Sequence, residues 1–304
     1  MENIQTFRSG FVSVIGKPNV GKSTLINYLL GQKIAAVSPR PQTTQRNQLG
    51  IITEKDYQII FIDTPGIHQP KSKLGDFMNE AAVGTFTEVD IILWIVNLNE
   101  PPAAEDQIVA EKIKNAGILS NTVLALNKAD LVSPANSERY ADRYRALVPG
   151  AESFLISAKT GAGCDDLLAA LVRRLPPGPA FYDEEQITDL YEREIARDLI
   201  RESLLKNLED EIPHSIAVRI DEYADRTETK SYIQATLILD RENHKSIVIG
   251  KNGEMIKKIG QDARSEIEKL TGRSIYLELK AKVVKNWRNN PSILKSLGYF
   301  LPKE

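Results

Sequence analysis

The residues with the clearest chemical meaning form a glycine-containing loop near the N-terminus. Gly16 and Gly21 bracket this loop, and Lys22-Ser23 follows directly, which fits the phosphate-binding pattern G-x-x-x-x-G-K-[ST]. The glycines let backbone N–H groups approach a phosphate, Lys22 supplies a positive charge, and the Ser23 hydroxyl can ligate Mg²⁺. The alternative is an ordinary glycine-containing turn between a strand and a helix. The residues predicted to bind phosphate are Gly16, Lys17, Pro18, Asn19, Val20, Gly21, Lys22, Ser23 and Thr24.

Two later stretches could complete a site for Mg²⁺ and a triphosphate. Asp63-Thr64-Pro65-Gly66 follows an apolar run, where a carboxylate can hold Mg²⁺ through water and the Gly66 N–H can approach a γ-phosphate. Thr44 lies in the polar segment 31–47 and could order that segment when a triphosphate binds. The plainer interpretations are an ordinary turn at 63–66 and a flexible loop with incidental threonines.

A third set of residues predicts which base is bound. Asn127-Lys128-Ala129-Asp130 follows another apolar run. The Asp130 carboxylate can accept two hydrogen bonds from the N1–H and N2–H₂ groups of guanine, whereas adenine would leave it unpaired at a large cost. Lys128 can lay its aliphatic stem along the base, and Asn127 would brace the loop. Backbone N–H groups of Ser157-Ala158-Lys159, a weak motif by itself, can meet the guanine O6 atom.

The elements that must position these residues alternate between strands and helices over residues 1–175. Such alternation predicts a mostly parallel, doubly wound sheet with helices on both faces. Ligands bind such sheets beyond the carboxyl ends of the strands. Every motif above directly follows a predicted strand, except Thr44, which lies in the segment after the first helix. Strands are predicted at 11–15, 48–53, 57–62, 91–96, 123–126 and 154–156, and helices at 23–30, 74–88, 104–116, 137–147 and 165–175.

Together these motifs, in this order, resemble those of the translation-factor-type P-loop GTPases. The resemblance implies GTP and GDP as ligands, with Mg²⁺ as the cofactor. By motif position it assigns phosphate binding to Lys22 and guanine recognition to Asn127, Lys128 and Asp130. It also assigns Mg²⁺ to Ser23, Thr44 and Asp63, with Ser157-Ala158-Lys159 closing over the base.

One residue departs from the Ras-like members of this class. Ile67 follows Asp-x-x-Gly, where those proteins carry a glutamine that orients the attacking water. Isoleucine has no polar side-chain atom, so catalysis must come from the backbone, a cation or a partner. Asn19 occupies the position at which potassium-activated relatives ligate K⁺, and such an ion could stabilise charge developing on the phosphates. That Asn19 only shapes the loop remains the alternative. The candidate catalytic residues are Lys22, Thr44 and Asn19.

A proline-rich stretch divides the chain. Residues 176–179 contain three prolines and a glycine, which cannot continue a helix and favour a stiff linker. We therefore predict a first domain at 1–175, a linker at 176–188 and a second domain at 189–304. In the second domain the patterns predict helices at 189–208, 241–248, 254–270 and 287–297, and strands at 215–223, 231–240 and 274–283.

The second domain carries a G-x-x-G loop between two predicted helices. Its two glycines would let a nucleic-acid backbone lie against the turn, while Lys251 and the following helix N-terminus favour phosphate. Ile247, Val248, Ile249 and Ile256 would wall an apolar groove for unpaired bases. In this order of elements the loop resembles the core of an α+β type II K-homology (KH) domain. The RNA-binding candidates are Ile249, Gly250, Lys251, Asn252, Gly253, Ile256, Lys257 and Lys258.

Composition and charge narrow the possible partners and the cellular compartment. The net charge is −2, but residues 181–240 hold 7 basic against 16 acidic residues and residues 241–304 hold 14 against 7. A basic C-terminal part agrees with a nucleic-acid partner, although a solvated charged face would look the same. The single cysteine, Cys164, excludes an intramolecular disulfide and suits a reducing cytoplasm. No apolar run reaches transmembrane length, and the first residues lack the features of a signal peptide.

Over nearly its whole length the chain resembles the Era family of bacterial GTPases, in domain order and in Pro41-Gln42-Thr43-Thr44. This resemblance implies a monomeric assembly factor of the small ribosomal subunit whose KH domain grips the 3′ end of 16S rRNA, with peripheral membrane contact. Gln45 stands where many relatives carry arginine, and Arg46 follows. One alternative is a signalling GTPase whose second domain binds protein. Another is an RNA-modifying enzyme, which would need a second catalytic constellation that residues 181–304 do not offer.

Overall fold

The computed structural model describes residues 7–37 and 43–299. The chain divides into two compact units, and each is described by itself. The first consists of Met1–Ala35, Thr44–Gln69 and Met78–Asp189, and the second of Ala36–Thr43, Pro70–Phe77 and Leu190–Glu304.

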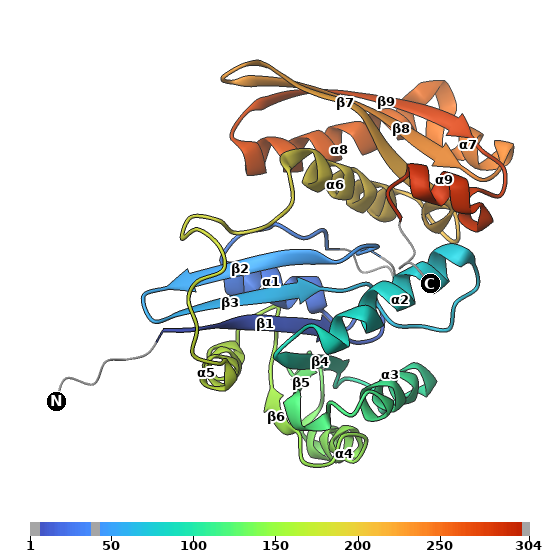
Figure 1. Cartoon of the computed structure of the whole chain (residues 1–304). Helices are drawn as coiled ribbons and strands as arrows, with labels where there is room; N and C mark the ends of the chain where they lie inside the picture. The colour runs from blue at the N-terminus through green and yellow to red at the C-terminus, as the bar shows by residue number, and fades with distance from the viewer. Residues whose placement is uncertain (1–6, 38–42, 300–304) are drawn as a thin grey trace. The chain divides into compact units, whose positions relative to one another are not determined.

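The first unit is built on a six-stranded sheet with the order β2-β3-β1-β4-β5-β6 (Figure 1). Only β2 runs antiparallel to its neighbour, and the other pairs are parallel. Parallel neighbours place their carboxyl ends at one edge, so the loops after β1, β3, β4, β5 and β6 meet there. The strands are β1 (Arg8–Ile15), β2 (Gln48–Glu54), β3 (Tyr57–Asp63), β4 (Ile91–Asn97), β5 (Thr122–Asn127) and β6 (Glu152–Leu155).

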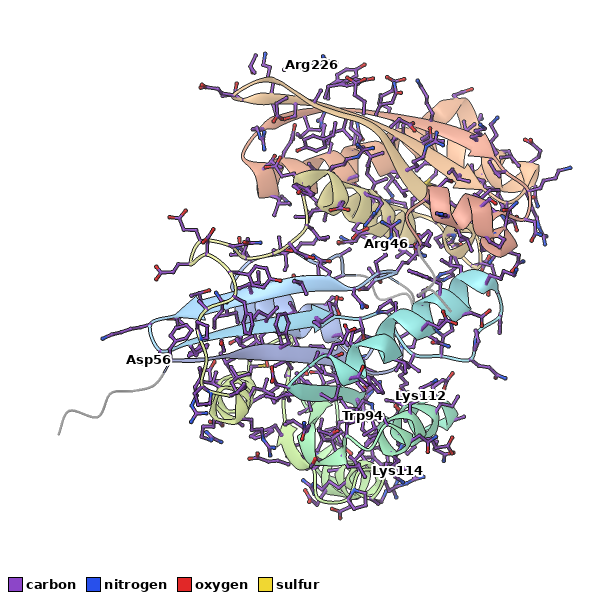
Figure 2. All side chains as sticks on the ribbon, in the orientation of Figure 1. Arg46, Asp56, Trp94, Lys112, Lys114 and Arg226 are labelled. Atoms are coloured by element: carbon purple, nitrogen blue, oxygen red, sulfur yellow. The ribbon has the colours of Figure 1, made fainter. Side chains whose placement is uncertain are left out.

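Both faces of this sheet are covered, which confirms the predicted doubly wound α/β fold. In β4, Leu93 and Ile95 face a core that also holds Leu25 of α1 and Leu167 of α5. The alternate residues, among them Trp94, face a second core formed with α2, α3 and α4. Trp94, labelled in Figure 2, is fully buried. A strand buried on both faces explains the continuous apolar run at 91–96.

The helices between β1 and residue 189 agree with the predicted ones apart from their ends. They are α1 (Lys22–Leu30), α2 (Lys73–Gly84), α3 (Ala104–Asn115), α4 (Pro134–Arg145) and α5 (Cys164–Arg174). The predicted helix at 74–88 ends earlier, at Gly84, and continues as a 3₁₀ turn. The predicted helix at 137–147 begins earlier, because Ser133 stands at the N-cap and Pro134 at the first helical position, where proline needs no N–H partner.

The proline-rich stretch after α5 runs alongside β1. Ser9 N donates to Pro176 O at 3.1 Å, and Gly178 N donates to Phe7 O at 3.1 Å. Further on, Ile51 N donates to Ile187 O at 2.9 Å. The stretch from the end of α5 to Asp189 therefore belongs to the first compact unit.

The second unit contains a three-stranded sheet with helices packed on it. The strand order is β7-β8-β9, with β7 antiparallel and β9 parallel to β8. Its core joins α6 and α8 to the sheet through residues such as Leu199, Leu237 and Ile259. The elements are α6 (Glu192–Asn207), β7 (Ile216–Thr227), β8 (Lys230–Leu239), α7 (Glu242–Ile249), α8 (Glu254–Thr271) and β9 (Ser274–Val283). Their order confirms the predicted KH architecture, and Figure 2 labels Arg226 near the outer end of the β7–β8 hairpin.

Two helices of this unit differ from their predicted ranges. The helix predicted from residue 189 begins at Glu192, because Tyr191 N donates to Glu194 Oε2 at 3.2 Å and so caps the N-terminus. The helix predicted at 287–297 is a 3₁₀ turn (Trp287–Asn289) followed by α9 (Pro291–Ser296), because Asn290 caps the second helix with its side chain. Within the described residues no helix is long and apolar enough to cross a membrane.

Candidate nucleotide site and G-x-x-G loop

The loop between β1 and α1 forms a cradle that only glycine permits at two positions. Gly16 and Gly21 have φ angles of 151° and 104°, which side chains rarely adopt. A Cβ atom on Gly16 would lie 2.3 Å from Ile95 O, and one on Gly21 would lie 2.3 Å from the Asn127 Nδ2 atom. The backbone is thus packed closely against β4 and β5, with its N–H groups continuing into the first turn of α1, an arrangement suited to an anion.

Lys22 lies beneath this cradle. Its Nζ atom donates to Lys17 O at 3.2 Å and Gly16 O at 3.4 Å, and the side chain is only 7% exposed. Burial lowers the pKa of Lys22 to about 8, against the opposing charge of Asp63. A bound phosphate would add negative charge beside this buried ammonium group, which offsets the cost of burying the lysine charge.

Three oxygen atoms converge next to the cradle. The Ser23 hydroxyl donates to Asp63 Oδ2 at 2.5 Å, Thr44 Oγ1 donates to the same oxygen at 3.1 Å, and the two hydroxyl oxygens lie 3.0 Å apart. The structure therefore brings together the three residues that we predicted as Mg²⁺ ligands, although they come from α1, β3 and the segment before β2. Hard oxygen donors of this kind suit Mg²⁺, so the residues fit the ion. Pro41 and Gln42, also singled out in the sequence, lie outside the described residues.

The loop after β3 returns directly to the cradle. Thr64 Oγ1 donates to Val14 O at 2.7 Å, and Ile67 N donates to Gly16 O at 3.0 Å. The Ile67 side chain is fully buried in the second core, so it lies away from solvent as well as lacking a polar group. Next to it, His68 Nδ1 is 2.8 Å from Gly66 O.

Asn127 links three of the predicted motifs. Its side chain is buried, its Nδ2 atom donates to Val20 O at 2.7 Å, and its Oδ1 atom accepts from Ala158 N at 2.9 Å. The phosphate loop, the Asn127–Asp130 segment and the Ser157–Lys159 segment are therefore joined through one amide. We predicted that Asn127 braces its own loop, and the geometry extends this brace to two others.

The remaining guanine-reading candidates line the same edge of the sheet. Lys128 has a φ angle of 65° and is half-buried; burial lowers its pKa, opposed by Glu100 and Asp130. Asp130 is exposed, as a carboxylate that receives a base must be. Ser157 is buried and its Oγ atom accepts from Thr160 N at 3.2 Å, which shapes the last loop, while Lys159 is exposed.

One residue that positions the site was not anticipated. Asn27 in α1 donates from Nδ2 to Ala35 O at 2.8 Å and accepts from Ile34 N and Ala35 N at its Oδ1 atom. It thereby fixes the start of the segment that leads to Thr44. In the sequence Asn27 is one polar residue within a helix, and nothing local reveals that it bonds to backbone seven and eight residues later.

The G-x-x-G loop lies between α7 and α8 as predicted. Gly250, Asn252 and Gly253 have φ angles of 73°, 52° and 80°, and α8 starts at Glu254. Lys251, Lys257 and Lys258 are exposed, and Ile249 and Ile256 are partly exposed. The expected groove wall is wrong at Val248, because this side chain is fully buried in the core of the unit.

Comparison with protein families gives two matches. The family model described as a 50S ribosome-binding GTPase matches residues 11–128, and the KH domain model matches residues 211–288. The chain is 46% identical over 294 residues to GTPase Era of Ruminiclostridium cellulolyticum, covering 97% of this chain and 98% of the relative. It is 44% identical over 297 residues to GTPase Era of Caldicellulosiruptor saccharolyticus, with the same coverage.

Two solved structures resemble the whole chain. One is Era in complex with MgGDPNP and nucleotides 1506–1542 of 16S ribosomal RNA, at 39% identity with a TM-score of 0.90. The other is a variant of Aquifex aeolicus Era bound to GDP·AlF4⁻, at 38% identity with a TM-score of 0.90. Each match covers 97% of this chain and 100% of the other.

Proposed function

This chain belongs to the Era family of GTPases, and from that premise we propose that it hydrolyses GTP to GDP and phosphate. We further propose that the GTP state controls binding of the single-stranded 3′ end of 16S rRNA during maturation of the small ribosomal subunit. One observation carries the proposal in this molecule: the oxygens of Ser23, Thr44 and Asp63 converge beside the glycine cradle and the buried Lys22. The relative solved with MgGDPNP and 16S rRNA supports the same ligand classes.

In this proposal each loop of the first unit binds a different part of the nucleotide. Residues 16–24 hold the phosphates, Lys22 neutralises the β- and γ-phosphates, and Ser23, Thr44 and Asp63 hold Mg²⁺, which spreads the charge that develops during phosphoryl transfer. Residues 63–66 approach the γ-phosphate. Asn127 orients the loops, Lys128 and Asp130 read guanine, and residues 157–159 close over the base. Isothermal titration with GDP and ADP tests this assignment: GDP must bind and ADP must not.

Hydrolysis needs a group that replaces the missing glutamine. We assign that role to Asn19, as a ligand for K⁺ next to the phosphates, with Lys22 and Thr44. A monovalent cation there would stabilise the developing charge. Asn19 has a φ angle of 63°, in the left-handed region that asparagine tolerates better than most residues. Phosphate release measured in KCl and in NaCl decides the point, and equal rates in both salts would remove K⁺ from the mechanism.

The RNA-binding role is assigned to residues 249–253, with Ile256, Lys257 and Lys258. Three residues of the loop have positive φ angles, a conformation that glycine and asparagine permit, and three exposed lysines supply charge for phosphate. Filter binding with a single-stranded fragment of the 16S rRNA 3′ end should show an affinity that falls steeply with salt. A protein-binding module would show neither property, which separates this proposal from a signalling GTPase.

Two substitutions test the loop. Gly253→Asp places a carboxylate at a φ of 80°, so it also strains the backbone. Asn252→Asp adds the same charge at a position whose conformation asparagine and aspartate both tolerate. Each should weaken RNA binding at least about tenfold through repulsion of phosphate and leave GDP affinity unchanged. Lys114→Gln, at an exposed position of α3 in the first unit (Figure 2), lowers the charge by the same single unit and is the control that should retain RNA binding.

Coupling between nucleotide and RNA is the remaining part of the proposal. GTP would order the segments around Thr44 and after Gly66, and hydrolysis would release them. A ligand shifts an equilibrium only by its differential affinity for the two states, so RNA affinity must differ between the GTP-analogue and GDP complexes. Equal affinities would remove the coupling and leave two independent activities.

We also propose a cytoplasmic monomer with reversible contact to membrane surfaces. Light scattering at several concentrations tests the monomer. Sedimentation with vesicles of anionic lipid tests the surface contact, and protein that stays in the supernatant would exclude it.

A further inference from the structure

The phosphate loop carries a lysine whose backbone belongs to the proposed cradle but whose side chain has no role in the assignments above. Lys17 is the residue after Gly16, and its Nζ atom lies 2.8 Å from Glu100 Oε1 and 3.0 Å from Asp106 Oδ2. Its side chain is 11% exposed and that of Asp106 is fully buried. Burial alone would lower the pKa of Lys17, but hydrogen bonds and charges from Glu100 and Asp106 outweigh it and raise that pKa. Lys17 is therefore a charged, fixed group.

The two carboxylates are themselves held by the fold. Asp106 lies in the first turn of α3, and the oxygen that accepts from Lys17 also accepts from Ala103 N at 2.9 Å. Glu100 lies in the loop after β4, where its backbone oxygen accepts from the Tyr144 hydroxyl at 3.3 Å. The Lys17 side chain thus binds to a rigid part of the first unit.

The backbone of Lys17 lies next to residues 63–66, the loop that we assign to the γ-phosphate. Its carbonyl oxygen accepts from Lys22 Nζ at 3.2 Å. The next residue, Pro18, packs so tightly on Gly66 that a Cβ atom there would lie 2.7 Å from Pro18 N and 2.8 Å from Pro18 Cα. A displacement of Lys17 would move Pro18 and change its contact with Gly66.

A buried ion pair is a weak source of stability, because desolvation of the charges offsets their attraction. Its distinctive effect is to fix one geometry, since the hydrogen bonds within the pair form only at short distances and in defined directions. Lys17 directly precedes Pro18, so the geometry that this pair fixes is the contact between Pro18 and Gly66.

We infer that Asp106, assisted by Glu100, is a positioning residue for GTP hydrolysis: through Lys17 it holds Pro18 against Gly66. Neither carboxylate belongs to a nucleotide-binding motif. The inference rests on the proposed GTPase function and adds residues to it. Because Gly66 serves the γ-phosphate, the pair matters for hydrolysis of GTP and much less for binding of GDP.

The test compares four variants with the wild-type chain. Asp106→Asn removes the charge but keeps an oxygen for Ala103 N. Lys17→Met removes the positive charge but keeps a side chain of similar length. Lys17→Arg keeps the charge and has donors that can reach both carboxylates. Asp106→Asn and Lys17→Met should each lower kcat about tenfold, equivalent to about 1.4 kcal/mol of the barrier. Their GDP affinity should stay within about threefold of wild type.

Two further results distinguish positioning from general support of the fold. The kcat of Lys17→Arg should lie within about threefold of the wild-type value. The double variant Lys17→Met with Asp106→Asn should be no slower than either single variant, because both substitutions remove the same interaction. If Asp106→Asn does not fold, Glu100→Gln serves instead, since Glu100 is about half exposed, and a smaller loss of kcat is expected.

Several outcomes would overturn the inference. An unchanged kcat in Asp106→Asn would do so, as would equal losses of GTP and GDP affinity, or additive losses in the double variant. A wild-type chain that does not hydrolyse GTP would instead contradict the proposed function itself, so the two failures are distinguishable.

Discussion

Replacing Asn127 with alanine tests the interpretation of the nucleotide site most directly. The Asn127 side chain is 2% exposed and makes two hydrogen bonds, to Val20 O at 2.7 Å and from Ala158 N at 2.9 Å. These bonds tie the phosphate loop and the last base loop to the end of β5. Asn127→Ala removes both bonds and leaves both backbone groups without their partner, while the strand itself is retained.

The size of the effect follows from those bonds. Each contributes about 0.5–1.5 kcal/mol net, and a buried backbone group left unsatisfied costs about 1–3 kcal/mol. Water that enters the space left by the amide would satisfy part of this demand, so we expect a total of about 2–4 kcal/mol. Expressed entirely in binding, this is a loss of GDP affinity of about 30- to 700-fold.

The assay measures GDP affinity by calorimetry and the free energy of unfolding by urea titration, because the loss can be divided between the two. Asn127→Asp keeps an oxygen for Ala158 N but sets a carboxylate against Val20 O, so it should be at least as damaging. Asn207→Ala is the matched control: Asn207 also donates to a backbone oxygen, Ser203 O at 3.0 Å, but it lies in the second unit. If Asn127→Ala bound GDP within threefold of wild type with unchanged stability, the bridging role would be refuted.

Three further predictions concern the same site. Because burial lowers the pKa of Lys22 to about 8, the free protein loses this proton as pH rises through 8. Calorimetry should show GDP affinity falling above pH 8, while Lys22→Arg stays level. The folded pKa lies below the unfolded value, so stability of the free protein should rise between pH 8 and 10.5 in urea titrations. Asp130→Asn should weaken GDP binding about 100-fold or more and favour xanthosine diphosphate; retained guanine preference in competition binding would contradict this. Gly66→Ala should reduce phosphate release at least about tenfold and spare GDP binding, because its Cβ atom would meet backbone atoms of Pro18 that cannot move cheaply.

The sequence predicted the site well wherever its residues follow strands. Asp63, Asn127 and Ser157 each stand at or just after the end of a parallel strand, so the topology alone brings them to one edge. Thr44 was predicted by a different argument, from a polar segment of unusual length, and the structure brings it to within 3.1 Å of Asp63. The roles of these residues remain predictions, whereas their convergence is observed.

Other features depend on contacts that no local pattern encodes. Lys17 and Asp106 are 89 positions apart, and only the packing of α3 beside the phosphate loop joins them. Val248 was expected in a groove because it belongs to the apolar run next to the G-x-x-G loop, but the 3.6-residue period of α7 turns it into the core. The start of α4 at Pro134 was missed although its proline at the first helical position is a local signal.

The burial of Ile67 connects the main findings about hydrolysis. A glutamine at this position would have to leave the core to reach a water molecule, because Ile67 is fully buried and its N–H is bonded to Gly16 O. The loop after Gly66 is thus anchored through its backbone to the phosphate loop, in which Pro18 packs against Gly66. The conformation there is set by proline, whose φ is fixed, and by Lys17, which Asp106 holds in place. The buried Ile67 and the ion pair of Lys17 therefore flank one contact, that between the phosphate loop and the loop after Gly66.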